Sequence, residues 1–266
     1  MSALSNHLEN ALANHYFGDT AYSPVANIFT GLSTATPSDT GVGTEVTGGS
    51  YARVSLTNNT TNFPNAASGA KQNGVAINFP AATGSWGTVG WAFTHDSTNL
   101  LTWGPLSSTQ IIANGDTLTF PIGAFLQTFG AGGGISDFLR NGLANLVFGG
   151  VALSPAATLH LSLYTIAPNQ SGGGTEVTGG SYVRKSFANN TTNFPNASNG
   201  VKSLAVEQVF ARATADWGTV VAVGLHDASV GGNLLAFFTP PVNRQRAILI
   251  GDDYALRAND FTLTFA

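Results

Sequence analysis

The sequence predicts a mainly β protein of two tandem homologous domains, each a short N-terminal α-helix followed by an antiparallel β-sandwich or jelly-roll-like domain. Three observations predict it. The segment from Thr44 to Ala66 recurs from Thr175 to Ala197 with only four differences in 23 positions. Charged residues are 9% of the chain, and the polar positions are mostly Thr, Ser, Asn and Gly, which is typical of strands and turns. Short apolar segments alternate with turn residues throughout.

The repeat defines the domain organisation. The same offset of 131 residues relates Leu8 to Leu139 and Trp86 to Trp217. A period this long is a whole domain, because solenoid repeats span only about 20–50 residues. We expect repeat 1 at residues 1–129, a flexible Gly-rich linker at 130–134 and repeat 2 at 135–266.

Each repeat opens with a helical pattern. Apolar residues recur every four positions: Leu4, Leu8, Leu12 and Tyr16, and then Ile135, Leu139, Leu143 and Val147. Ser2 or Ser5 is positioned to cap the first helix, and Gly18 to end it. A single apolar stripe has to be buried, either against the following β-domain or against a neighbouring subunit.

Strands follow each helix. Leu159, Leu161 and Leu163 alternate with polar residues and predict a half-buried strand. Further strands are expected at Tyr51–Leu56, Val75–Phe79, Trp86–Thr94, Leu100–Trp103, Thr117–Phe120 and Phe125–Phe129, with counterparts in repeat 2. Repeat 2 carries small insertions, one at residues 230–232, which raise the offset to 136 at the C-terminus.

Charge and composition exclude several function classes. The net charge is −4, with no basic run and no cysteine, so we expect no nucleic-acid partner and no thiolate metal site. The first residues do not have the pattern of a signal peptide. No apolar run approaches the length of a membrane helix, which is about 20 residues. Residues 1–131 hold two basic and six acidic residues, whereas residues 132–266 hold eight of each. The two repeats are therefore expected to face different neighbours.

Two recurring motifs are candidates for chemistry. His95-Asp96 recurs as His226-Asp227, but adjacent strand residues point to opposite faces, so a turn-initiating Asp beside a packed or exposed His is favoured over a general base. The Thr-Gly-Gly-Ser-Tyr block at 47–51 lacks the lysine of a phosphate loop. Its glycines are expected to supply positive φ in a turn. We expect no catalytic, cofactor-binding or metal-binding residue, and no enzymatic activity.

The remaining candidates are structural or interface residues. Glu45 and Arg53 recur as Glu176 and Arg184 and are expected to pair, within a domain or between subunits. The Asn-rich segment with Asn59 and Phe63 recurs with Asn190 and Phe194. It is interpreted as a self-satisfied loop at an interface, with a sugar-binding loop as the alternative. Trp86 and Trp217 are expected to anchor the core or the packing between sheets.

Several of these motifs occur together in a known family. Repeat 1 contains SNHLENALANHYFG, TEVTGGSYAR, NNTTNFPNA and ATGSWGTV, and it resembles small virion proteins of tailed bacteriophages described as tail fibre proteins. Repeat 2 matches at its helix, at TEVTGGSYVR, at NNTTNFPNA and at DWGTV, and departs after His226. The resemblance implies a structural virion component and supplies no catalytic residue. The tandem duplication departs from the usual single copy.

The function expected from these observations is a structural component of a tailed-bacteriophage virion, a tail fibre or tail-associated protein that assembles through protein–protein contacts. The first alternative is a capsid decoration (cement) protein that stabilises the head shell, and the second is a carbohydrate-binding module for host-surface glycans. Partners would be other virion proteins and further copies of the chain. A trimer with six similar domains in a pseudo-sixfold arrangement is the hypothesis for the homo-oligomer. Localisation to the virion, with assembly in the host cytoplasm, is expected.

Overall fold

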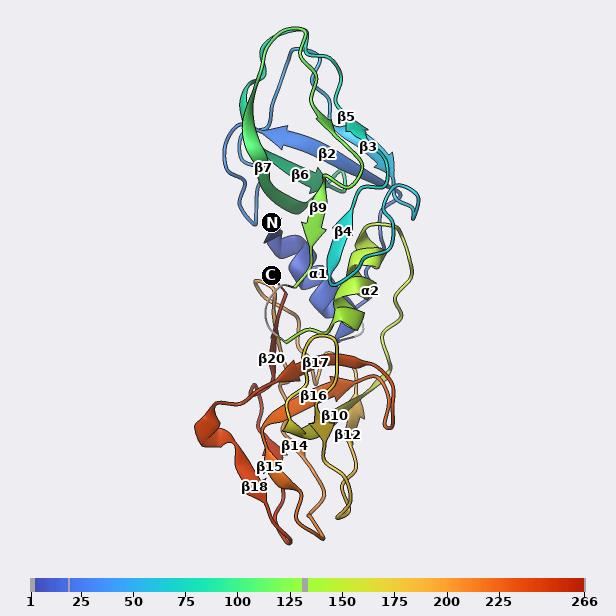
Figure 1. The fold of residues 1–266 in the computed structure, drawn as a ribbon, viewed down its shortest axis with the longest axis vertical. Coiled ribbons are helices and arrows are strands. Elements are labelled where there is room, and N and C mark those ends of the chain that lie inside the picture. Colours follow the sequence, from blue (N-terminus) through green and yellow to red (C-terminus); the bar gives the residue numbers. More distant parts are fainter. Residues whose placement is uncertain (1–2, 19, 131–133, 266) are drawn as a thin grey trace.

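The computed structural model describes residues 3–18, 20–130 and 134–265. Figure 1 shows an elongated molecule with one β-rich body at each end and the two helices between them. Repeat 1 forms one β-body and repeat 2 the other, and both chain ends lie near the middle. Three residues of the expected linker, 131–133, lie outside the described residues.

The two helices begin and end as their sequences require. Helix α1 spans Asn6–Tyr16, and the Ser5 hydroxyl caps it by accepting a hydrogen bond from the Leu8 amide at 3.2 Å. Gly18, with φ of +120°, follows its last turn. Helix α2 spans Asp137–Val147 and is capped in the same way by Ser136. Each helix starts after its first predicted apolar residue, because that residue lies in a short β pairing instead.

Repeat 1 is built from two layers of antiparallel strands. One layer has the order β1-β7-β6-β2-β3. Its strands are β1 (Ala3–Leu4), β2 (Asn27–Ser33), β3 (Val54–Thr57), β6 (Gly87–His95) and β7 (Leu100–Ile112). The other layer contains two pairs: β4 (Ala70–Gln72) with β9 (Leu126–Thr128), and β5 (Ile77–Asn78) with β8 (Thr119–Phe120). The side chains of Leu32, Ile77, Trp86 and Phe125 are buried in one apolar cluster between the layers.

Repeat 2 has the same two-layer arrangement, but the counterpart of the long β6–β7 hairpin is divided into two shorter strand pairs. Its main sheet has the order β11-β10-β16-β17, with β12 also paired to β10. The strands are β10 (Thr158–Ile166), β11 (Thr175–Glu176), β12 (Lys185–Ala188), β16 (Ala222–His226) and β17 (Leu234–Phe238). The second layer pairs β13 (Val201–Ser203) with β20 (Thr262–Thr264) and β14 (Gln208–Val209) with β19 (Ala255–Leu256). A further pair, β15 (Gly218–Val220) with β18 (Arg246–Ile248), continues the hairpin after the 3-10 turn Val242–Arg244.

The predicted fold class, mainly β with a helix before each domain, is confirmed, whereas some strand limits differ. Strand β7 continues beyond Trp103 to Ile112 because the register shift between Val89 and Trp91 accommodates Pro105, which has no amide hydrogen to donate. Strand β3 starts only at Val54, since the ring of Tyr51 packs against Trp86 at a centroid distance of 5.4 Å.

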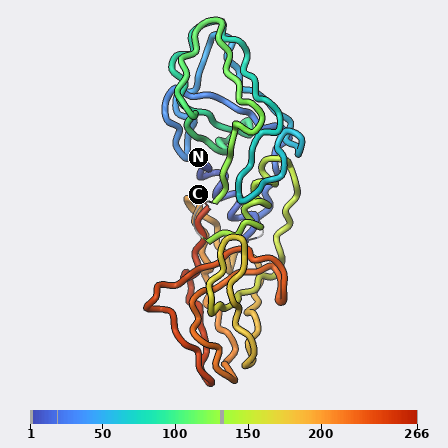
Figure 2. The backbone as a smooth tube through the Cα atoms, in the orientation of Figure 1, coloured from blue at the N-terminus to red at the C-terminus, as the bar shows by residue number. Residues whose placement is uncertain are grey.

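The helices carry a core that belongs to both repeats. One apolar cluster contains Leu8 and Phe17 of the first helical segment, Leu143 and Phe148 of the second, and the interior of repeat 2. Helix α1 packs on β13 of repeat 2, and helix α2 packs on β4 of repeat 1. In Figure 2 the blue N-terminal segment runs beside the red C-terminal end of the chain. Each helix is thus buried by the partner repeat as well as by its own.

Candidate functional site

The strongest candidate site is the contact between the repeats, formed by two helical arms. We define arm 1 as α1 with Phe17 and Gly18, and arm 2 as α2 with Phe148 and Gly149. Arm 1 begins on repeat 1, where the Ser5 amide donates to the Leu101 carbonyl at 2.9 Å. Arm 2 begins on repeat 2, where the Ser136 amide donates to the Leu235 carbonyl at 2.9 Å. The far end of each arm enters the other repeat.

The Asn-rich loops form the receptors for the arms. Asn59 Oδ1 accepts from the amides of Thr61 and Asn62 at 3.0 and 2.9 Å, and Asn190 makes the matching bonds in repeat 2. These bonds fix an irregular loop from within. At the end of each loop a backbone amide donates to the opposite arm: Ala66 to Asn145 Oδ1 at 2.8 Å, and Ala197 to Asn14 Oδ1 at 2.7 Å.

An aromatic side chain anchors each arm. Phe17 of arm 1 meets Phe194 at a centroid distance of 5.3 Å. Phe148 of arm 2 meets Phe63 at 5.4 Å. Phe63 and Phe194 are fully buried by these contacts. The alternative that the loops present these rings to a glycan is therefore wrong, because the arms cover them.

Asparagines clamp the end of each arm. Asn58 Nδ2 donates to the Val147 carbonyl at 2.8 Å, and its Oδ1 accepts from the Gly149 amide at 2.5 Å. Asn189 bonds the Tyr16 carbonyl and the Gly18 amide in the same way, at 2.8 and 2.9 Å. A helix end whose carbonyls and amides are satisfied by the partner repeat resists fraying.

A buried lysine completes each contact. Lys71 of repeat 1 donates to Asn145 Oδ1 of arm 2 at 2.7 Å, and Lys202 of repeat 2 donates to Asn14 Oδ1 of arm 1 at 2.7 Å. Both lysines are only 1% exposed. Burial lowers the pKa of each ammonium group to about 8, because the charged form is less well solvated there.

These contacts are reciprocal: arm 1 meets repeat 2 through the same residue types with which arm 2 meets repeat 1. Reciprocal contacts are the signature of an isologous, twofold-related interface. The symmetry between the two arms is not complete. Glu9 of arm 1 lies against Gly200, whereas its counterpart Arg140 lies against Gly69. Arg140 pairs with Asp137, while burial raises the pKa of Glu9 to about 7.

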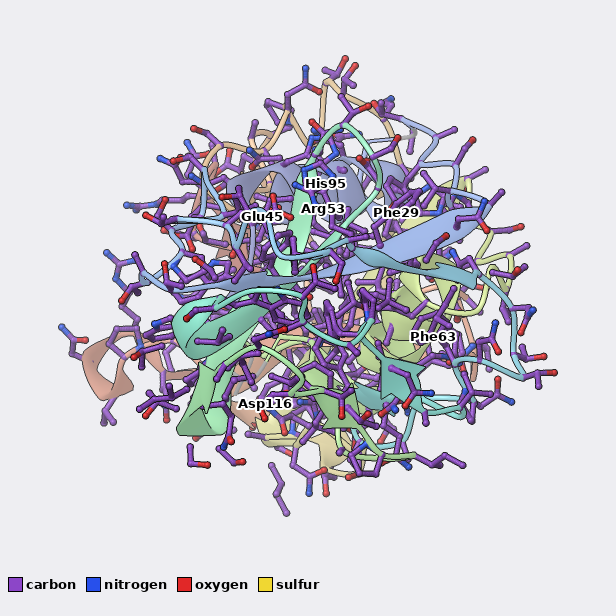
Figure 3. The ribbon with its side chains drawn as sticks, turned by 90° about the horizontal axis from the view of Figure 1, so that it is seen from above. Phe29, Glu45, Arg53, Phe63, His95 and Asp116 are labelled. Atoms are coloured by element: carbon purple, nitrogen blue, oxygen red, sulfur yellow. The ribbon has the colours of Figure 1, made fainter. Side chains whose placement is uncertain are left out.

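The Glu–Arg pairs lie within each domain, away from the arms. Arg53 Nη2 meets Glu45 Oε2 at 2.7 Å, and Arg184 Nη2 meets Glu176 Oε2 at the same distance. A tyrosine hydroxyl, Tyr51 or Tyr182, donates to the same carboxylate. Figure 3 shows Glu45 and Arg53 side by side near His95, with Phe63 on a different part of the molecule. Each pair thus closes its own turn within one repeat.

The tryptophans fasten the glycine turn to the core. Trp86 Nε1 donates to the Gly49 carbonyl at 2.9 Å, and Trp217 Nε1 donates to the Gly180 carbonyl at 2.8 Å. Gly49 and Gly180 have φ of +49° and +52°, a region that glycine enters without steric cost. The Thr-Gly-Gly-Ser-Tyr block is therefore a turn held by a buried indole.

The His-Asp motifs have the geometry of turns. Asp96 Oδ1 accepts from the amides of Thr98 and Asn99, and Asp227 accepts from Asn233. His226 Nε2 lies 3.0 Å from the Tyr164 hydroxyl. Burial lowers the pKa of His226 to about 4, so the imidazole is neutral at pH 7. Neither aspartate bonds the adjacent histidine ring.

Sequence reasoning missed Asn14, Asn145, Lys71 and Lys202, which carry the polar part of the arm contact. The signal was present, because both pairs recur at the offset of 131 residues outside the nearly identical block. Among the described residues, no group of three or more His, Asp or Glu side chains has the arrangement of a metal site. None of the helices described is long and apolar enough to cross a membrane.

The fold and the site define a class: a structural protein in which two β-bodies are joined by exchanged helical arms. The chain belongs to the family described as Podophage GP4 fiber I protein gp80, whose family model matches residues 3–128 and again residues 134–264. The expected relation to phage fibre proteins, with a duplication, is confirmed by this match. No curated protein matches the chain.

Proposed function

We propose that this chain is a tail-associated fibre component of a bacteriophage virion and that it acts through protein–protein contacts without catalysis. The observation that carries the proposal is the match of both repeats to a fibre protein family. Exchanged arms support it, because a body clamped at its middle can hold two β-domains at a fixed separation. Localisation to the virion and assembly in the host cytoplasm follow from this proposal.

Exposed apolar side chains on both repeats are available to neighbouring virion proteins. Ile111 and Ile122 of repeat 1 are 76% and 70% exposed, and Ile250 of repeat 2 is 68% exposed. Under this proposal these side chains become covered when the neighbouring virion proteins bind. We propose that each repeat meets a different neighbour, since the charge of the two repeats differs.

The trimer remains a hypothesis, and the twofold relation of the repeats restricts how its six domains can be arranged. Neighbours in a true sixfold ring are related by a rotation of 60°, which a reciprocal contact does not allow. Six domains from three chains would therefore alternate in orientation. Native mass spectrometry of the assembled component tests the hypothesis, and chain counts that are not multiples of three would contradict it.

Gold-labelled antibodies against this chain, applied to intact virions, test the location. The proposal expects label on tail-associated fibres in electron micrographs. Label distributed over the head shell would contradict it and would instead favour the capsid decoration alternative. Particles that lack the chain serve as the control for non-specific label.

A further inference from the structure

Repeat 2 contains an arginine-lined pocket of about 250 Å³ between β17, β18 and β19. We call it the β18 pocket. Its lining includes three guanidinium groups, one carboxylate and two aromatic rings, from Arg244, Arg246, Arg257, Asp260, Phe238 and Tyr254. The whole chain has only ten Lys and Arg residues. Three of them in one small pocket is a marked concentration of positive charge.

Repeat 1 has the equivalent pocket, and there it is uncharged. We call it the β7 pocket; its volume is about 510 Å³. Strand pairing fixes the correspondence, because Val89 pairs with Gln110 as Val220 pairs with Arg246, and Ile77 pairs with Phe120 as Gln208 pairs with Leu256. The same register places Ser108, Gln110, Pro121 and Ala124 where repeat 2 has Arg244, Arg246, Arg257 and Asp260. All four of these repeat 1 residues line the β7 pocket.

This comparison shows that the fold does not need the arginines. The same architecture closes around a neutral pocket in repeat 1, so the charges in repeat 2 were not required to build the β-domain. Gathering like charges costs free energy unless an anion offsets it. One carboxylate is present, and Arg244 Nη1 lies 3.2 Å from Asp260 Oδ1. The two other guanidinium groups leave the pocket with a net positive charge.

The remaining polar groups are available to a ligand. Among the described residues, the guanidinium of Arg257 has no hydrogen-bond or ion-pair partner, and the Tyr254 hydroxyl has none either. Arg246 Nη2 donates to the carbonyl of Asp253, which leaves its other N–H groups unused. Planar guanidinium groups match carboxylates and phosphates through paired hydrogen bonds.

The aromatic rings add a second recognition element. Tyr254 packs edge to face on Phe210, and Phe238 packs edge to face on Phe261, so both rings are held rigidly. A ring that lines a small pocket offers an apolar face for the C–H groups of a sugar. Asp260 supplies an acceptor for hydroxyl groups. Small-molecule sites characteristically combine apolar walls with a few fixed polar groups.

We propose that the β18 pocket binds an anionic saccharide, with the carboxylate or phosphate on Arg246 and Arg257 and the sugar ring beside Tyr254 and Phe238. The β7 pocket lacks every charged group that this ligand needs. The binding is thus a property of repeat 2 alone. The site is separate from the arms and does not depend on where the chain sits in the virion.

The test uses the full chain labelled with ¹⁵N and follows the Nε–H signals of the arginines by NMR. Glucuronate and glucose 6-phosphate separate a carboxylated from a phosphorylated ligand, and neutral glucose is the control. At least one charged sugar is expected to shift the Arg246 and Arg257 signals in a saturable way. Arg257→Gln should weaken that binding at least tenfold, whereas the matched variant Pro121→Gln in the β7 pocket should not change it.

Three outcomes would overturn the proposal. The first is that neither charged sugar binds in a saturable way. The second is that inorganic phosphate binds as tightly as the charged sugars and that Tyr254→Ala does not change this binding, which would show a site for anions without recognition of the sugar. Binding of an acidic peptide without binding of either sugar would show a protein-docking surface instead. An unchanged amide spectrum outside the pocket is the folding control for every variant. It is expected for Arg257→Gln, because Arg257 is exposed. Tyr254 is only 8% exposed and belongs to the apolar core, so the result for Tyr254→Ala counts only where that control is met.

Discussion

The contacts between the repeats and the side pockets of the repeats have diverged to different degrees. Asn14 with Lys202 and Asn145 with Lys71 make the same bond at the same 2.7 Å. In the pockets, by contrast, Pro121 corresponds to Arg257 and Ala124 to Asp260. A reciprocal contact constrains both copies at once, since each receptor must fit the arm of the other repeat. A pocket open to solvent is free of that constraint.

The largest expected effect comes from breaking the arm contact. Phe194→Ala and Phe63→Ala should each lower the free energy of unfolding by about 3–5 kcal/mol, because each removes a buried ring that packs on the opposite arm. Urea unfolding followed by circular dichroism measures the loss. Since each repeat is completed by the arm of the other, we expect one cooperative transition in both variants. Two separate transitions would show that the repeats fold independently.

The loss of stability on removing a Glu–Arg pair should be smaller than this and should differ between the two repeats. Arg184 is 8% exposed and also donates to the carbonyls of Ala228 and Gly231, whereas Arg53 is 27% exposed. Arg184→Ala is therefore expected to cost about 3 kcal/mol and Arg53→Ala about 1 kcal/mol. Denaturant unfolding of the two variants in parallel checks the order. Equal losses would show that burial does not decide the strength of these pairs.

The buried lysines predict a pH dependence. The pKa of Lys71 and of Lys202 is about 8 in the folded chain, against about 10.4 when unfolded. Between pH 8 and 10 the unfolded chain binds more protons, so the free energy of unfolding should rise with pH, by up to about 1.4 kcal/mol per pH unit for each lysine. Lys71→Met with Lys202→Met should flatten this rise in urea titrations at pH 8, 9 and 10. A rise that persists in the double variant would assign it to other groups.

The smallest effect is expected in the β18 pocket. Arg244 pairs with Asp260, but its side chain is 63% exposed. Arg244→Gln should change the melting temperature little, corresponding to less than about 1 kcal/mol. Ser108→Gln at the matched position of repeat 1 is the control. A loss as large as that of Arg184→Ala would mean that the arginine is part of the domain's structural framework.

Much of the fold could be predicted from local patterns. The four-residue spacing predicted both helices, and Ser5 was one of the two predicted caps of the first helix. The glycines of the Thr-Gly-Gly-Ser-Tyr block predicted a turn with positive φ. The break of the long hairpin in repeat 2 also had a local signal, since Pro240 and Pro241 follow one residue after the end of β17. These features depend on residues close together in the sequence.

The arm exchange could not be predicted in the same way. The apolar stripe of α1 requires burial, but nothing in it distinguishes its own domain from the other repeat. Lys71 and Lys202 were missed because lysine is rarely buried, and their acceptor lies on a helix of the partner repeat. Pairings between distant segments have no local signature, and recurrence at a fixed offset was the only clue.

The exchanged arms also have a kinetic and stoichiometric consequence. Two separate copies would meet by a second-order reaction and would dissociate on dilution, whereas tethered copies meet at the high effective concentration that a short connection creates. The pairing within this chain is therefore a first-order event that is insensitive to how much protein the cell makes. It also joins one neutral β7 pocket to one basic β18 pocket in every molecule. An assembly that receives this chain receives the two unlike ends in a fixed one-to-one ratio.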